Sequence, residues 1–332
     1  MLQSRAPAPS VGRRRLLALA AALPLGLARA EPVLEASRPI RILVPNAVGG
    51  TSDLLARLID ARLADRGQLV IVENRPGAAG RIALEHVARA APDGYTLLLG
   101  NNGTNAVAVA AGAEPAAEAD IPALTPIIRL TSVAIVIAVI PALGVSTLAQ
   151  LLALARATPG QLSYASGGVG STSHLAAALL LRSAGVSMVQ IPYAGTAAAV
   201  KDVLGGQVPI VFTQLGTIAP YLKSGQLRAL AVTSARRVAG FRDIPTVAES
   251  GFPGFAVTTW HGILAPPGTP ADIVARLNRA LTQVIASPAV REQLATLGME
   301  AAATTPAAFA AEIRSERERW AAIARDVGAT DK

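Results

Sequence analysis

The segment Pro45–Asp53, Pro-Asn-Ala-Val-Gly-Gly-Thr-Ser-Asp, places the strongest constraint on how this chain can fold. It joins a short apolar run, 40–44, to an amphipathic run from Leu54 whose apolar residues recur every three or four positions. That order predicts a buried strand, a tight turn and a helix. Glycines in the turn let the backbone approach a ligand, and the free amides at a helix N-terminus attract an anion. A capped turn without a ligand has the same pattern, so this segment alone does not decide between the two.

The pattern recurs at Ser166–His174, Ser-Gly-Gly-Val-Gly-Ser-Thr-Ser-His, between a strand predicted at 162–165 and a helix predicted at 175–184. Two such turns, one in each half of the chain, would place two helix N-termini on the walls of one cleft. A third polar turn, 100–104, follows the strand predicted at 95–99. Ligands bind at the carboxyl ends of parallel strands, but a simple Asn- and Gly-rich turn fits this third segment equally well.

Strands and helices alternate along most of the chain. The predicted strands are 40–44, 69–72, 95–99, 127–140, 162–165, 188–191, 208–212 and 227–233, and a further strand contains Trp260 and His261. One predicted helix begins at 54 and the last begins at 305. The helices between them are 82–90, 148–157 (capped by Ser146), 175–184, 196–204, 216–223 and 270–285. Alternation predicts an α/β fold with parallel strands joined by right-handed crossovers. The long run 127–140 is rich in β-branched residues, so we interpret it as a strand crossing into a second domain. The apolar run 227–233 could be the strand by which the chain returns to the first domain.

Residues 1–30 have the features of an export signal. Three arginines, Arg13 to Arg15, precede an apolar run, 16–27, and Ala28-Arg29-Ala30 is a cleavage site of A-x-A type. The apolar run is shorter than the roughly 20 residues that cross a membrane. Paired arginines before leucines also fit a twin-arginine signal loosely. We expect cleavage after Ala30 and a soluble protein in the periplasm.

Composition excludes several classes of function. Residues 1–30 hold five of the 30 basic residues and none of the 22 acidic ones, so the remainder has 25 basic and 22 acidic residues, a net charge of +3. The sequence shows no dense basic patch with interleaved aromatic residues, and we therefore expect no nucleic-acid partner. Without cysteine, thiolate metal sites, a cysteine nucleophile and disulfides are excluded. A chain of 332 residues has room for two domains with real cores.

An enzyme is the rival interpretation. Ser171 and His174 could belong to a hydrolytic triad, but the chain lacks a G-x-S-x-G elbow and both residues fall on one helical turn. It also lacks an H-E-x-x-H metal motif and a G-x-G-x-x-G dinucleotide motif. His174 is more simply a packed, hydrogen-bonded ring, and Asp53 a carboxylate that compensates a helix dipole. We expect no catalytic residue, no metal and no cofactor.

The chain resembles the extracytoplasmic solute-binding receptors of tripartite tricarboxylate transporters, the Bug family. The resemblance covers 37–330. In the first part of the chain it rests on Arg38-Pro39-Ile40, Pro45 with Gly49-Gly50 and Asp53, Val72-Glu73-Asn74-Arg75-Pro76-Gly77 and Ala91-Pro92-Asp93-Gly94-Tyr95. Farther on it rests on Tyr164-Ala165-Ser166 with Gly170-Ser171 and His174-Leu175, Pro192-Tyr193, Leu204-Gly205-Gly206-Gln207-Val208, 227–233 and Pro245-Thr246-Val247-Ala248-Glu249. It implies a two-domain periplasmic-binding-protein fold of type II, with two crossover strands and a ligand cleft between the domains. The domains would be 31–133 plus 245–332, and 134–244.

The resemblance also implies a function. Family members mostly bind small carboxylates between the two glycine-rich turns and deliver them to membrane permease subunits, while some report to a sensor kinase instead. We expect a monomer. The residues expected to bind the ligand are Asn46, Gly49, Gly50, Thr51, Ser52, Asp53, Asn101, Thr104, Ser166, Gly168, Gly170, Ser171, Thr172, Tyr193 and Thr213. Tyr193 could equally well fill the core.

This chain departs from the family pattern at positions that bear on the ligand. Other members commonly have an aromatic residue at the position of Asn46 and a proline at the position of Val48. They have a third glycine where this chain has Thr51, and commonly an aspartate where it has Thr213. Neither glycine-rich turn contains Arg or Lys, so anion binding would rest on backbone amides and hydroxyls. The identity of the carboxylate therefore cannot be transferred from other members.

Overall fold

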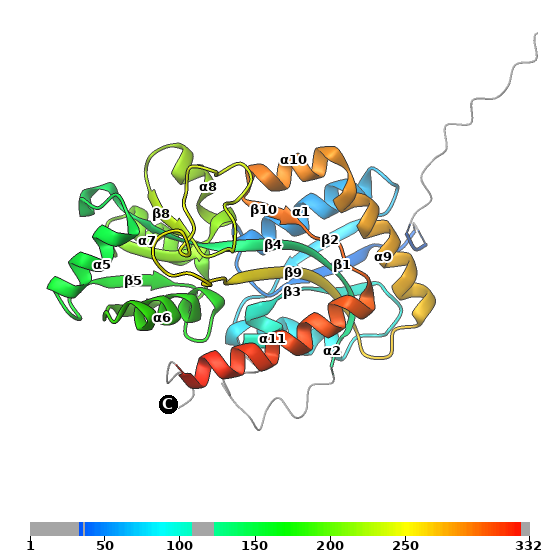
Figure 1. Ribbon diagram of the computed structural model, residues 1–332. Coiled ribbons are helices and arrows are strands. Elements are labelled where there is room, and N and C mark those ends of the chain that lie inside the picture. The colour runs from blue at the N-terminus through cyan, green and yellow to red at the C-terminus, as the bar shows by residue number, and fades with distance from the viewer. Residues whose placement is uncertain (1–32, 36, 108–122, 327–332) are drawn as a thin grey trace, which may run out of the picture. The chain divides into compact units, whose positions relative to one another are not determined.

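Figure 1 shows a computed structural model that describes residues 33–35, 37–107 and 123–326. The predicted export signal, 1–30, lies outside the described residues. The strands are β1 (Ile40–Val44), β2 (Val70–Asn74), β3 (Thr96–Asn101), β4 (Thr125–Val139), β5 (Ser163–Ser166), β6 (Val189–Pro192), β7 (Ile210–Gln214), β8 (Arg228–Val232), β9 (Thr258–Ala265) and β10 (Met299–Ala301). The helices are α1 (Thr51–Ala64), α2 (Arg81–Ala88), α5 (Leu148–Ala157), α6 (Thr172–Ala184), α7 (Thr196–Leu204), α8 (Leu215–Lys223), α9 (Ala271–Ala286), α10 (Pro288–Thr296) and α11 (Pro306–Asp326). The mixed α/β class is as predicted.

One sheet runs through the described residues in the order β2-β1-β3-β9-β4-β7-β5-β6, with β8 and β10 also paired to β4. The first half of the sheet contains β1, β2, β3, β9, β10 and the part of β4 up to Ala134, and the second half contains β5 to β8 and the rest of β4. The strand predicted at 127–140 is therefore present as β4 and is shared by both halves. Strands β1, β2 and β3 are parallel to one another, as are β5, β6 and β7.

The expectation of parallel strands fails at the centre of the sheet. β4 is antiparallel to β7, β8 and β9, and β9 is also antiparallel to β3. The segment by which the chain returns to the first half also differs from the expectation. Strand β8, which was expected to lead back to the first half, pairs with β4 inside the second half. The chain returns farther on, where the Val257 amide donates to the Thr233 carbonyl at 2.8 Å and β9 begins.

Apolar side chains cover both faces of the sheet. In the first half one face packs against α1, α9 and α10, through residues such as Ile42, Leu55 and Leu281. The opposite face packs against α2 and α11 through Leu98 and Phe309. These helices hold the carboxyl ends of the strands in place, and that is where the cavity described below lies.

Helix α11 contributes to the cores of both halves (Figure 1). Phe309 belongs to the first-half cluster on the α2 side, while Trp320, three turns later, is fully buried among second-half residues such as Phe212. The helix can approach closely because Phe309 lies over Gly262 of β9, where a Cβ atom would overlap the ring. Phe309 also meets Trp260 edge-on, with ring centroids 4.9 Å apart.

The helix caps are set by local chemistry. Ser146 was expected to cap the helix at 148–157, but Thr147 is the N-cap of α5. Its hydroxyl accepts from the Gln150 amide while the Gln150 side chain accepts from the Thr147 amide, which forms a complete capping box. The Ser146 amide also donates to Gln150 Oε1, at 2.7 Å. The residue three positions before a glutamine therefore caps this helix.

Candidate functional site

A cavity of about 500 Å³ opens at the carboxyl ends of the parallel strands in both halves. The residues that line it follow β1, β2, β3, β5 and β6 directly, and Gln214 ends β7. This is the edge of an α/β sheet at which ligands bind. The two glycine-rich turns predicted from the sequence thus line a single cavity.

Most of the predicted ligand residues line this cavity. Those that do are Asn46, Gly50, Thr51, Ser52, Asn101, Thr104, Gly168, Gly170, Ser171, Thr172 and Tyr193; those that do not are Gly49, Asp53, Ser166 and Thr213. Tyr193 also packs against the apolar core of the second half, so it takes both of the roles considered for it. None of the described side chains that line the cavity is charged.

Helices α1 and α7 begin at the cavity without a side-chain cap. Their N-cap residues are Gly50 and Gly195, which have no side chain to accept a hydrogen bond from the first-turn amides. Both glycines line the cavity. The first amides of each helix therefore remain available to a ligand, at the positive end of the helix dipole.

These two helix N-termini lie side by side. A Cβ atom on Gly50 would lie 3.9 Å from the Thr196 hydroxyl at the start of α7. The Thr217 hydroxyl of α8 lies 2.9 Å from that of Thr51 and 3.4 Å from that of Thr196. Thr51 belongs to the first half and Thr196 to the second, so both halves contribute donors to one place.

The second glycine-rich turn satisfies its own backbone. The amides of Gly167 and Gly170 donate to Ser173 Oγ at 3.0 Å and to His174 Nδ1 at 3.1 Å. The Ser171 hydroxyl caps α6 by accepting from the His174 amide, and it donates to the Gly168 carbonyl at 2.7 Å. This turn contributes a fixed wall, and most of its polar atoms already have partners.

The same contacts decide the role of His174. Burial lowers the pKa of this ring below its ordinary value, which favours the neutral form. The neutral ring accepts a hydrogen bond from the Gly170 amide through Nδ1. The ring is therefore part of the turn, as the packed interpretation predicts, and is not placed as a catalytic base.

A cluster of amides and hydroxyls forms the wall nearest β1 and β3. Asn46 Oδ1 accepts from the Ser52 hydroxyl at 3.0 Å and from Asn101 Nδ2 at 3.1 Å. Asn101 Oδ1 in turn accepts from the Thr104 amide at 3.2 Å. Because the Asn46 oxygen is already used twice, its NH₂ group is the part left to donate to a ligand.

Asp53 and Thr213 have their side chains elsewhere. Asp53 Oδ2 accepts from the Gly49 amide at 3.0 Å and from Arg57 Nε at 3.1 Å. Burial by itself raises the pKa of Asp53, but the hydrogen bonds from Arg57 and Gly49 hold it below its usual value. Thr213 is fully buried in β7, and its Oγ1 atom has no hydrogen-bond partner among the described residues.

Several residues that line the cavity were not predicted from the sequence, among them Pro76 to Ala78 after β2, and Thr196 and Gln214. Thr196 follows Gly195 after β6, which repeats the glycine, hydroxyl and helix pattern of the first turn, so a local signal was present. Gln214 carries no comparable signal, because only its place after the buried Thr213 puts it at the end of β7. No group of three or more candidate metal ligands occurs in the described part of the chain.

Comparison with known proteins places these features in a family. Residues 55–329 match the model of the tripartite tricarboxylate transporter family receptor. The protein BugT of Bordetella pertussis is 36% identical over 295 residues, which cover 88% of this chain and 90% of BugT. No helix among the described residues is long and apolar enough to cross a membrane.

Two solved structures are close in fold. Rpa4515 of R. palustris with adipate is 34% identical with a TM-score of 0.83, covering 88% of this chain and 98% of that one. MatC (Rpa3494) from Rhodopseudomonas palustris with bound malate is 32% identical with a TM-score of 0.78, covering 86% and 99%. Family members are periplasmic binding proteins, not enzymes. The chain belongs to the tripartite tricarboxylate transporter receptor family, which includes the Bug proteins.

Proposed function

We propose that this protein is a periplasmic receptor that binds a small carboxylate in the cavity between Pro45–Asp53 and Ser166–His174. It then delivers the ligand to the permease subunits of a tripartite tricarboxylate transporter. The export signal 1–30 would be removed after Ala30. A ligand-sensing receptor for a sensor kinase would use the same cavity and differ only in its membrane partner.

The observation that carries this proposal is the pair of uncapped helix N-termini in a cavity whose described lining carries no charged side chain. Anions are stabilised where free amides and the positive ends of helix dipoles converge, and more so away from bulk water. The N-cap residues Gly50 and Gly195 leave that position open on α1 and α7. One carboxylate could therefore accept from both helices at once.

The wall nearest β1 and β3 suits a second polar group of the same ligand. It presents the NH₂ group of Asn46 beside Asn101 and Thr104, and none of the described side chains in this wall is charged. The relatives described above hold adipate and malate, acids with a carboxylate at each end. We therefore propose a dicarboxylate of four to six carbons as the ligand class.

The proposal includes two domains, predicted from the sequence as 31–133 plus 245–332 and 134–244, that close on the ligand by hinge motion. The hinge would lie where β4 passes from the first half to the second and where the chain returns between Thr233 and Val257. Val247, Phe255 and Val257 pack in the second-half core, so the return boundary would fall near 257 and not at 245.

Titration calorimetry with succinate, malate, glutarate and adipate tests the proposal. At least one should bind, and its diamide should bind at least tenfold more weakly because helix N-termini favour the charged form. Thr196→Val, which removes a hydroxyl at the cavity, should weaken binding of the same acid. Equal affinity for acid and diamide, or no binding by any of the four, would overturn the proposed ligand class.

A further inference from the structure

Asn102 lies directly behind the cavity wall and uses its whole side chain to hold its position. It is 1% exposed and does not line the cavity, although its neighbours Asn101 and Gly103 do. Its Oδ1 atom accepts from the Trp260 amide at 2.8 Å. Its Nδ2 atom donates to Glu316 Oε2, also at 2.8 Å. The wall is thus tied to β9 on one side and to α11 on the other.

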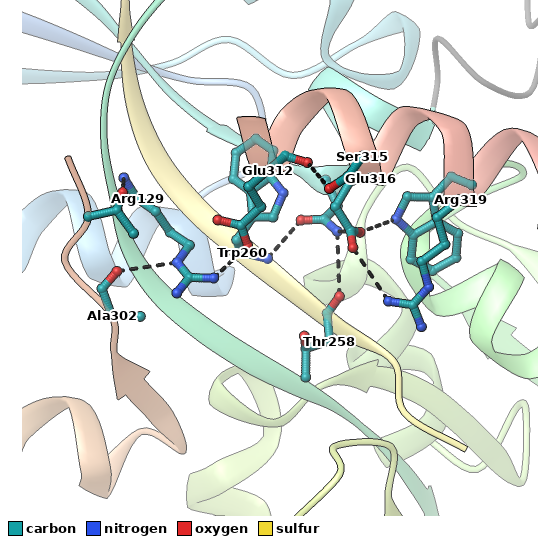
Figure 2. A network of polar contacts seen from close by, with 11 residues as sticks. Arg129, Thr258, Trp260, Ala302, Glu312, Ser315, Glu316 and Arg319 are labelled. Atoms are coloured by element: carbon teal, nitrogen blue, oxygen red, sulfur yellow. Dashed lines mark hydrogen bonds and ion pairs between the residues drawn. The ribbon is translucent and has the colours of Figure 1, made fainter. Parts of the chain in front are cut away.

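Glu316 connects this wall to the core of the second half (Figure 2). The same Oε2 atom accepts from Trp320 Nε1 at 2.7 Å, and the Trp320 ring is fully buried in that core. The Glu316 side chain is mostly buried, at 16% exposure, so these hydrogen bonds are shielded from water. Arg319 donates to the other carboxylate oxygen, Glu316 Oε1 (Figure 2). It also donates to the carbonyl of Ala256, the residue before Val257, where the chain returns to the first half.

A second contact from α11 reaches the same turn. Arg317 Nε donates to the Asn105 carbonyl at 2.9 Å. The turn between Asn101 and Asn105 is therefore held from behind by α11 at two points. On its cavity side it carries the Asn101 amide that orients Asn46.

We propose that Glu316 is a positioning residue for ligand binding. Through Asn102 it fixes the wall formed by Asn101 and Thr104, and through Trp320 it ties that wall to the second half. Since one carboxylate oxygen serves both donors, a shift of the second-half core relative to β9 is transmitted to the cavity wall. This inference deepens the proposed function and rests on it for the nature of the ligand.

The variants separate positioning from simple stabilisation of α11. Glu316→Ala removes the acceptor for both donors, whereas Glu316→Gln keeps one oxygen that can accept from both. Glu312→Ala is the matched control on the same helix, one turn earlier, because the Glu312 side chain pairs with Arg129 of β4 and forms no hydrogen bond with the described residues 101–105.

The first readout is hydrogen exchange in the ligand-free protein. Peptides covering 101–105 should exchange about tenfold faster in Glu316→Ala than in wild type. Glu316→Gln and Glu312→Ala should leave these peptides unchanged, even where Glu312→Ala lowers global stability as much. Exchange in 101–105 that is no faster in Glu316→Ala than in Glu312→Ala would overturn the positioning role.

The second readout is calorimetric affinity for adipate. Glu316→Ala should bind about tenfold more weakly, with Glu316→Gln and Glu312→Ala within about twofold of wild type, as expected for a residue that acts through a contact network. Faster exchange with unchanged affinity would overturn the link between the wall and binding. If the wild type binds neither adipate nor another acid of the panel, the proposed function fails, and the exchange result alone decides the positioning role.

Discussion

The hydroxyls of Thr51 and Thr217 lie 2.9 Å apart and share a hydrogen bond, although 166 residues separate them in the chain. Thr217 also approaches the Thr196 hydroxyl, at 3.4 Å. One hydroxyl of α8 therefore contacts the first residue of α1 and the first residue of α7. It sets the spacing of the two helix N-termini that we propose to hold a carboxylate.

Thr217→Val should weaken carboxylate binding by roughly 2- to 10-fold, because a neutral hydrogen bond is worth about 0.5–1.5 kcal/mol. Calorimetry with the best acid of the panel measures this. Thr213→Val is the control, since the Thr213 hydroxyl is buried without a partner and its loss should leave affinity unchanged. Equal effects of the two variants would argue against a role for the Thr217 contact.

Ser171→Ala should lower the free energy of unfolding by about 1 kcal/mol, because the Ser171 hydroxyl caps α6. Ser171→Gly should cost less, since glycine is tolerated at N-cap positions. Urea unfolding of both variants measures the difference. A Ser171→Ala protein as stable as wild type would show that the cap seen at the His174 amide contributes nothing.

Acids without an α-amino group should bind at least tenfold more tightly than the matching amino acids. An ammonium group in the cavity would lack a carboxylate partner, because no described side chain that lines it is charged and Asp53 is held by Gly49 and Arg57. An unpaired buried charge costs several kcal/mol. Succinate against aspartate, and glutarate against glutamate, are the direct comparisons by calorimetry, and tighter binding of either amino acid would contradict the expectation.

Acid should destabilise the protein through His261. Complete burial lowers the pKa of His261 from 6.5 to about 4, so the unfolded chain takes up this proton first as the pH falls. The His261 contribution is fully present above pH 6.5 and is lost between 6.5 and about 4, at up to about 1.4 kcal/mol per pH unit.

The measurement is urea unfolding at several pH values. His261→Gln, which does not titrate, should show a shallower loss of stability in this window. Part of the pH dependence of stability should remain in His261→Gln, because burial also lowers the pKa values of His86 and His174. Parallel curves for variant and wild type would mean that His261 takes up its proton without cost in the folded protein.

Gly262→Ala should destabilise the protein by about 1–3 kcal/mol, because the new Cβ atom would overlap the Phe309 ring and approach the Ile128 carbonyl. Phe309→Leu in the same chain should recover part of this loss by making room. Thermal unfolding of the two single variants and the double variant measures the coupling. Strictly additive effects would mean that the ring does not restrict residue 262.

Local chemistry explains what the sequence could predict. Glycines followed by Thr51 or Ser171 specify strand-to-helix turns wherever they occur, and the β-branched run 127–140 specifies a long strand. The same local reasoning placed the cap of α5 at Ser146, one residue before Thr147, which is the N-cap in the structure. Most of the cavity lining follows from these turns, because the strands within each parallel set, β1 to β3 and β5 to β7, have their carboxyl ends together, and ligands bind at such ends.

What the sequence could not predict depends on pairing and on side-chain direction. Nothing local marks β9 as antiparallel to its neighbours, since pairing is decided by contacts between distant segments. The position of Thr213 outside the cavity lining could not be predicted for a simpler reason. Successive residues of a strand point to opposite faces, so an error of one position separates the buried Thr213 from Gln214 at the cavity.

The contact between Asn102 and Glu316 also has a consequence for the order of folding. The two residues are 214 positions apart, and contacts of such separation form late because a large loop must close first. Strands β1, β2 and β3 pair with one another from nearby segments, but β9 must cross back from position 258 to pair with β3, and the wall behind Asn101 is completed only when α11 docks. We therefore expect competence to capture a ligand to be acquired late in folding, so that a partly folded chain would not compete for the ligand with finished molecules.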